Sequence, residues 1–112
     1  MVNTFLHFYD FFRSLLVRNG DTERAAAEFR KAIEIEPQNA AAYNNLGDIL
    51  ATTRSLESAI SEFEVAITLK SSLAEAHYNL ALLLLRKGDR ERSLAEFQRA
   101  QTLDPRLKPP AN

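Results

Sequence analysis

The apolar positions of this chain follow a helical spacing, and that spacing returns at a fixed distance along the sequence. Residues 25–36 read AAAEFRKAIEIE and are followed by Pro37. Phenylalanine and alanine then recur at intervals of 34 residues, as Phe29, Phe63, Phe97, Ala32, Ala66 and Ala100. A period of this size is typical of a chain built from repeated units of secondary structure.

The periodic pattern predicts six helices, at residues 3–18, 22–35, 40–53, 56–69, 73–86 and 90–103. Links of two to four residues join them, so consecutive helices must run antiparallel. We expect one all-α domain over residues 1–105, with three hairpin repeats at about 6–39, 40–73 and 74–107. Residues 106–112 hold two adjacent prolines and should be an extended or disordered tail.

Short polar motifs mark the expected helix ends. Gly88, like the glycine before the second helix, precedes an aspartate and can adopt the left-handed conformation that ends a helix. Asn39 should cap the helix that follows it. Ser72 and Glu75 match a capping box, in which the serine caps the helix and the glutamate reaches back.

The three copies resemble the tetratricopeptide repeat family. Its hairpin has an aromatic residue, a Leu and a small residue on the first helix, then Ala, Phe and Ala on the second. The matching residues are Tyr9, Phe12, Leu16, Ala25, Phe29, Ala32 and Pro37 in the first copy, Tyr43, Leu46, Gly47, Leu50, Ala59, Phe63 and Ala66 in the second, and Leu80, Ala81, Leu84, Phe97, Ala100 and Pro105 in the third. The resemblance covers about residues 6–107 and implies a right-handed α-solenoid of three antiparallel helical hairpins, six helices in all.

Two substitutions depart from the repeat and bear on its architecture. Arg54 stands where the other two hairpin turns have glycine. Residues 41–67 could therefore open into one long helix and exchange hairpins between chains. Gln101 replaces an isoleucine of the first two copies, at a position that would face a following repeat. A polar residue there leads us to expect that the array ends after residue 105.

Charge and composition exclude several classes of partner. The 112 residues include 14 basic and 15 acidic side chains, a net charge of −1, so attraction to nucleic acid or to an anionic membrane surface has no support. Asp10 and Arg13 interrupt the apolar N-terminal stretch, which then fits neither a signal peptide nor a membrane span. The chain has no cysteine, and we expect a cytoplasmic location.

Residues that could carry catalysis or bind a cofactor are scarce. His7 and His77 lie far apart and lack the spacing of a metal site, and His77 aligns with the tyrosines of the other copies as a packing residue. Three glycines cannot supply a phosphate-binding loop. We therefore expect no enzymatic activity, no metal and no cofactor.

The family resemblance implies a peptide-binding groove lined by the first helix of each hairpin. Carried onto this chain, the lining is Asp10, Phe11, Ser14, Arg18, Asn44, Asn45, Asp48, Glu75, Tyr78, Asn79, Leu82 and Arg86. The asparagines can both donate to and accept from a peptide backbone, and Phe11 and Tyr78 offer aromatic anchors. Of the positions that clamp a C-terminal carboxylate in some relatives, only Asn45 matches. Binding of a chaperone tail by that mechanism is therefore not expected.

Two hypotheses of function follow. The first is a non-enzymatic scaffold that binds a peptide or helix of another protein in the groove. The second is a self-associating structural module that forms a homodimer through the N-terminal helix. Its aromatic residues extend over more of that helix than one hairpin can cover: Phe5, Phe8, Tyr9, Phe11 and Phe12.

Overall fold

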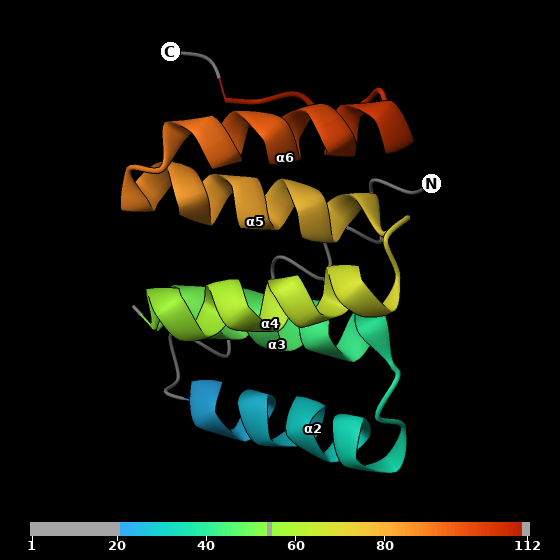
Figure 1. Cartoon of the computed structure of the whole chain (residues 1–112). Coiled ribbons are helices and arrows are strands. Elements are labelled where there is room, and N and C mark those ends of the chain that lie inside the picture. Colours follow the sequence, from blue (N-terminus) through green and yellow to red (C-terminus); the bar gives the residue numbers. More distant parts are fainter. Residues whose placement is uncertain (1–20, 54, 111–112) are drawn as a thin grey trace.

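A computed structural model describes residues 21–53 and 55–110 of the chain (Figure 1). This part contains no strand, and its helices are α2 (Thr22–Ile35), α3 (Ala40–Thr52), α4 (Leu56–Leu69), α5 (Ala74–Lys87) and α6 (Arg90–Leu103). Each differs from its expected range by at most one residue at either end. The helix expected at residues 3–18 lies outside the described residues. The all-helical solenoid is confirmed.

Two of the predicted helix ends are confirmed, and the predicted capping box is wrong. Asn39 caps α3, since its side chain accepts a hydrogen bond of 3.1 Å from the Ala42 N–H. Gly88 ends α5 with a φ of 96°, a conformation that glycine adopts without strain. The capping box was wrong: Leu73 is the N-cap of α5, and no side chain caps it. Ser72 instead lies inside the preceding turn, one residue too early to reach the helix.

The turn between α3 and α4 is closed within one chain. α3 ends at Thr52, and the N–H of Ser55 donates back to the Leu50 carbonyl at 3.3 Å. α4 then begins at Leu56 and packs on α3. This contradicts the alternative in which residues 41–67 form one continuous helix. Residue 54 itself lies outside the description.

Glycine allows the two helices of the second hairpin to approach closely. A Cβ atom added to Gly47 of α3 would lie 3.0 Å from the ring of Phe63 on α4, tighter than ordinary van der Waals contact. The Phe63 side chain is almost completely buried, with 1% of its surface exposed. A small residue at this position therefore lets α3 and α4 pack closely.

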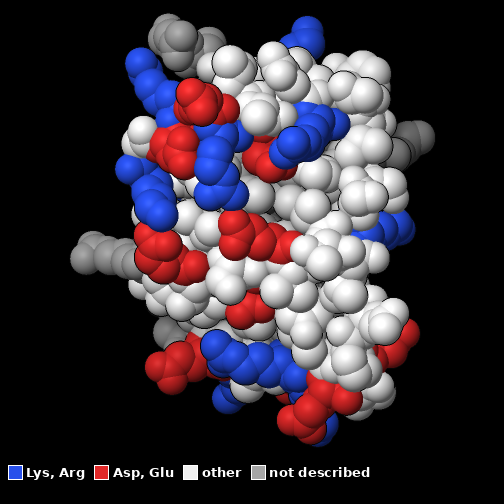
Figure 2. All heavy atoms as spheres, viewed as in Figure 1, with Lys and Arg blue, Asp and Glu red and all other residues white. Residues whose placement is uncertain are grey.

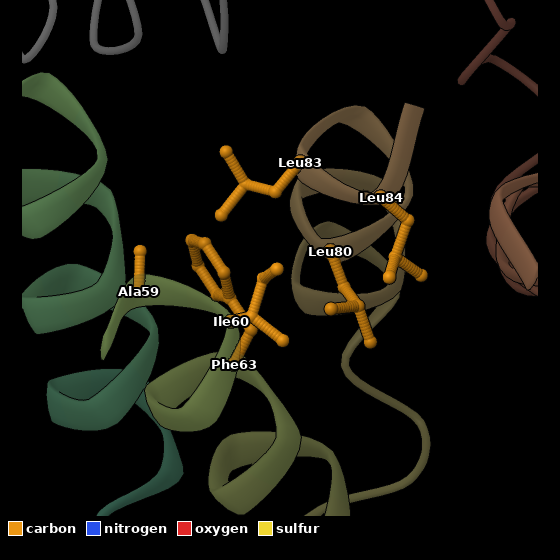
Figure 3. Packing of buried hydrophobic residues seen from close by; sticks show 6 residues of the cluster. All are labelled: Ala59, Ile60, Phe63, Leu80, Leu83 and Leu84. Carbon is orange, nitrogen blue, oxygen red and sulfur yellow. The ribbon is translucent and has the colours of Figure 1, made fainter. Parts of the chain in front are cut away.

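Each junction between hairpins contains an apolar cluster. At the first junction, Ala25, Ala26 and Phe29 of α2 pack with Leu46 and Ile49 of α3. At the second, residues of α4 meet those of α5, as Figure 3 shows for Ala59, Ile60, Phe63, Leu80, Leu83 and Leu84. The second helix of one hairpin thus packs on the first helix of the next, which produces a stack.

The surface carries charges of both signs. On the face drawn in Figure 2, acidic and basic side chains are interspersed rather than gathered by sign. Within residues 21–53 and 55–110, no helix has the length and apolar character that a membrane crossing requires.

Candidate binding groove

The first helices of the second and third hairpins, α3 and α5, are joined by a pair of asparagines. The side-chain amide of Asn79 donates to the Asn44 Oδ1 over 3.4 Å. Asn44 is buried and Asn79 is half-buried, so each side chain spends part of its hydrogen-bonding capacity within the protein. This corrects the expectation for Asn44: its carbonyl holds two hairpins together, and 8% exposure leaves it little access to a ligand.

A surface pocket of about 320 Å³ lies beside this pair. It is lined by Asp48, Ala51, Phe63, Asn79, Leu82, Leu83, Leu85 and Arg86. Four of these residues, Asp48, Asn79, Leu82 and Arg86, belong to the groove predicted from the sequence. Apolar side chains form most of the wall, and the polar groups lie among them, as is usual for sites that bind a ligand.

Tyr78 occupies a different place from the one expected. Its ring meets the Phe97 ring edge-on, with centroids 5.5 Å apart, and its hydroxyl donates to the Lys108 carbonyl at 3.0 Å. Tyr78 therefore contacts α6 and the C-terminal residues, and it does not line the pocket. A free aromatic anchor is not what this residue provides.

The remaining predicted groove residues are dispersed or not described. Glu75 is exposed in the first turn of α5, away from the pocket, and Asn45 is half-buried on α3. Asp10, Phe11, Ser14 and Arg18 lie outside the described residues. The structure thus brings together Asp48 of α3 with Asn79, Leu82 and Arg86 of α5.

A buried polar network in the third hairpin was not expected from the sequence. His77 Nδ1 lies 2.7 Å from Glu96 Oε1, and His77 Nε2 lies 2.8 Å from the Ser71 carbonyl oxygen. Arg99 donates to the other oxygen of Glu96 at 2.7 Å. Because a carbonyl oxygen can only accept, His77 Nε2 donates the hydrogen bond to Ser71. The signal was present in the sequence as a histidine where the other copies have tyrosine.

A second pocket, of about 390 Å³, lies against this network. Its lining is His77, Ala95, Gln98, Arg99, Thr102 and Leu103. It belongs to the α5–α6 hairpin alone, and none of its residues was predicted to bind a ligand. Across the described residues, no three side chains of the metal-ligating types gather into a potential site.

Comparison with known proteins identifies the family of this chain. The profile of the tetratricopeptide repeat family matches residues 14–74, and a second profile of the same description matches residues 74–107. The chain belongs to the tetratricopeptide repeat family. No curated protein matches it.

Solved structures share the fold at low sequence identity. MamA superposes with a TM-score of 0.73 at 22% identity, over 83% of this chain and 54% of the MamA chain. The first tetratricopeptide repeat domain of Spaghetti (RPAP3), bound to the HSP90 peptide SRMEEVD, gives a TM-score of 0.75 at 17% identity, over 83% of this chain and 74% of that chain. This chain spans about half the length of MamA. At these identities the likeness establishes the fold.

Proposed function

We propose that this chain is a non-enzymatic interaction scaffold that binds a peptide or helix of a partner protein between α3 and α5. One observation carries the proposal. Four residues that the family resemblance assigns to the groove, Asp48, Asn79, Leu82 and Arg86, line one pocket across two hairpins. A groove that crosses the junction between hairpins can bind an extended segment of a partner along its length. The larger pocket beside His77 is confined to one hairpin.

The chemistry of the pocket supports a ligand with an apolar side chain. Leu85 is 40% exposed and lies beside Leu82, so the mouth of the pocket has apolar surface that a ligand would cover. Arg86 and Asn79 at the same pocket can hydrogen-bond backbone or side-chain groups of the ligand. The peptide-bound Spaghetti domain supports this mode of binding by analogy of fold. The mismatched clamp positions still argue against a chaperone C-terminus.

A matched pair of leucine substitutions tests the site. Leu82→Asp places a charge in the groove pocket, and Leu103→Asp makes the same change in the other pocket. Proteins captured from the source cell and identified by mass spectrometry should be lost with Leu82→Asp and retained with Leu103→Asp. The double variant Asn45→Ala, Asn79→Ala should also lose them. Capture that survives both groove variants, in chains whose helical circular dichroism is intact, would reject the groove.

Self-association through the N-terminal helix is the alternative that the sequence raises. Its aromatic residues lie outside the described part of the chain, so it stands on the sequence pattern alone. A monomeric mass by light scattering at high micromolar concentration would exclude it.

A further inference from the structure

The second helix of each described hairpin presents equivalent positions to whatever follows it in the stack. These positions are Ala26, Phe29 and Ile33 in α2, Ile60, Phe63 and Ile67 in α4, and Leu94, Phe97 and Gln101 in α6. In α2 they pack with residues of α3, and in α4 with residues of α5. On α6 the same positions form a surface, here called the α6 face, and among the described residues no helix of a following hairpin packs on it.

The α6 face is covered at one end and bare at the other. Leu94 is 57% exposed, whereas Ile60, its equivalent on α4, is 5% exposed. Phe97, however, is as buried as Ile60. The Tyr78 ring of α5 lies edge-on against Phe97 and accounts for part of this burial.

The residues after α6 repeat a turn found at the two earlier junctions. The N–H of Leu107 donates to the Asp104 carbonyl at 3.0 Å, as Asn39 does to Glu36 and Leu73 to Lys70. After the first two turns a helix begins at the next residue, but residues 108–110 are not helical. Figure 1 shows this segment turning back from the end of α6.

An arginine fork strengthens this third turn. Arg106 donates from Nε and Nη2 to the two carboxylate oxygens of Asp104, each at 3.0 Å, and its backbone N–H donates to Oδ1 at 3.1 Å. These hydrogen bonds lower the pKa of the Asp104 carboxyl, so the pair stays ionised at neutral pH. Neither of the other two turns has a matching acid–arginine pair.

The contact of Tyr78 shows what this segment replaces. In α3 the equivalent residue, Asn44, receives its hydrogen bond from Asn79, a residue of the next hairpin. In α5, Tyr78 makes its hydrogen bond with the carbonyl of Lys108. Lys108 is equivalent to Ala40 and Ala74, the residues where α3 and α5 begin. Leu107 beside it is half-buried.

We propose that residues 104–110 are a built-in cover for the α6 face, which takes the place of a further hairpin and keeps a second copy of the chain from stacking there. An uncovered end of a solenoid exposes apolar surface shaped to receive another repeat, and such a head-to-tail contact can continue without closure. The cover blocks the end of the face where Phe97 and Tyr78 meet, so a second copy finds only Leu94. This inference is independent of the groove.

Truncation after Pro105 tests the cover directly. We expect the truncated chain to increase in mass with concentration in light scattering, relative to the full chain at each concentration. Adding Leu94→Glu to the truncated chain should reverse this increase, because the charge lies on the α6 face. Equal masses for the full and truncated chains, or an increase that Leu94→Glu leaves unchanged, would overturn the proposal.

A milder variant keeps the test decisive if truncation lowers helicity. Tyr78→Phe in the full chain removes only the hydroxyl that holds Lys108, and Tyr43→Phe, at another half-buried tyrosine, is the matched control. We expect Tyr78→Phe to lower the heteronuclear NOE of the Leu107 and Lys108 amides and to raise the concentration-dependent mass. The control should change neither. A Tyr78→Phe chain that behaves like the control in both measurements shows that the segment is not held as a cover.

Discussion

Glu62 of α4 and Glu96 of α6 occupy equivalent positions 34 residues apart, yet their surroundings differ. Glu96 is buried and has His77 and Arg99 as partners. Partial burial raises the pKa of the Glu62 carboxyl, and the charge of Arg30 offsets only part of this effect. The difference arises from two substitutions between the copies, His77 for Tyr43 and Arg99 for Val65.

This comparison shows that one repeat pattern can be stabilised in two ways. In the α3–α4 hairpin, helix contact depends on shape, with Gly47 under the Phe63 ring. In the α5–α6 hairpin, Ala81 replaces the glycine, and its carbonyl accepts a 2.8 Å hydrogen bond from the buried Ser93 hydroxyl. The third hairpin therefore depends on polar groups that must all find partners, whereas the second depends on close packing.

The largest expected effect is on the polar network. His77→Ala removes a partner of buried Glu96 and leaves a void. We expect it to lower the free energy of unfolding by about 3 kcal/mol, and no more than that because Arg99 still donates to Glu96. Urea denaturation followed by circular dichroism measures it. His77→Tyr restores a ring, as in the second hairpin, and separates lost packing from lost hydrogen bonds. A His77→Ala chain as stable as the wild type would mean that Glu96 does not depend on His77.

A smaller effect is expected from packing in the second hairpin. Gly47→Ala brings a Cβ to 3.0 Å from the Phe63 ring. The strain of overpacking costs about 1–3 kcal/mol, and about 1 kcal/mol returns because alanine favours helix over glycine. The melting temperature should fall slightly. The reciprocal change Ala81→Gly should also lower the melting temperature. The third hairpin already accommodates the Ala81 Cβ, and glycine has a lower helix propensity than alanine. A higher melting temperature for Gly47→Ala would show that the ring can move aside.

The smallest effect concerns Glu62. Because the pKa of the Glu62 carboxyl is raised in the folded state, the folded chain binds the carboxyl proton more tightly than the unfolded chain does. The ionised carboxylate therefore costs stability at neutral pH, and the cost disappears as the pH falls below the ordinary carboxyl pKa of 4.5. Glu62→Gln should add about 0.3 kcal/mol at pH 7, a small gain because solvent screens a partly exposed group, and nothing at low pH. Urea denaturation at both pH values checks it. A loss of stability at pH 7 would mean that the attraction of Arg30 outweighs burial.

Most of the fold could be predicted from the sequence because the apolar spacing of the helices recurs in each copy. Helix positions followed from apolar spacing, and Asn39 and Gly88 marked ends through local chemistry that needs no distant partner. The capping box at Ser72 failed for the opposite reason. Its four-residue pattern fits a helix start, but a backbone turn shared by all three copies determines where α5 begins.

The candidate site could be predicted only in part. The family resemblance assigns residues of α3 and α5 to the groove, and four of them line a common pocket. It does not tell which of those side chains are used inside the protein. Asn44 bonds across the junction, and Tyr78 bonds to the C-terminal segment. Both contacts join residues 30 or more positions apart, which no local pattern encodes.

The sequence by itself determined the repeat, the helices and the small and aromatic residues that allow hairpins to stack, because these depend on spacing along one chain. The tertiary structure alone decided how equivalent positions differ. It paired His77 with Glu96, set Glu62 near the charge of Arg30, and placed Lys108 against Tyr78. Hydrogen bonds and burial depend on what lies opposite each side chain, and the neighbour opposite is set by how the hairpins stack.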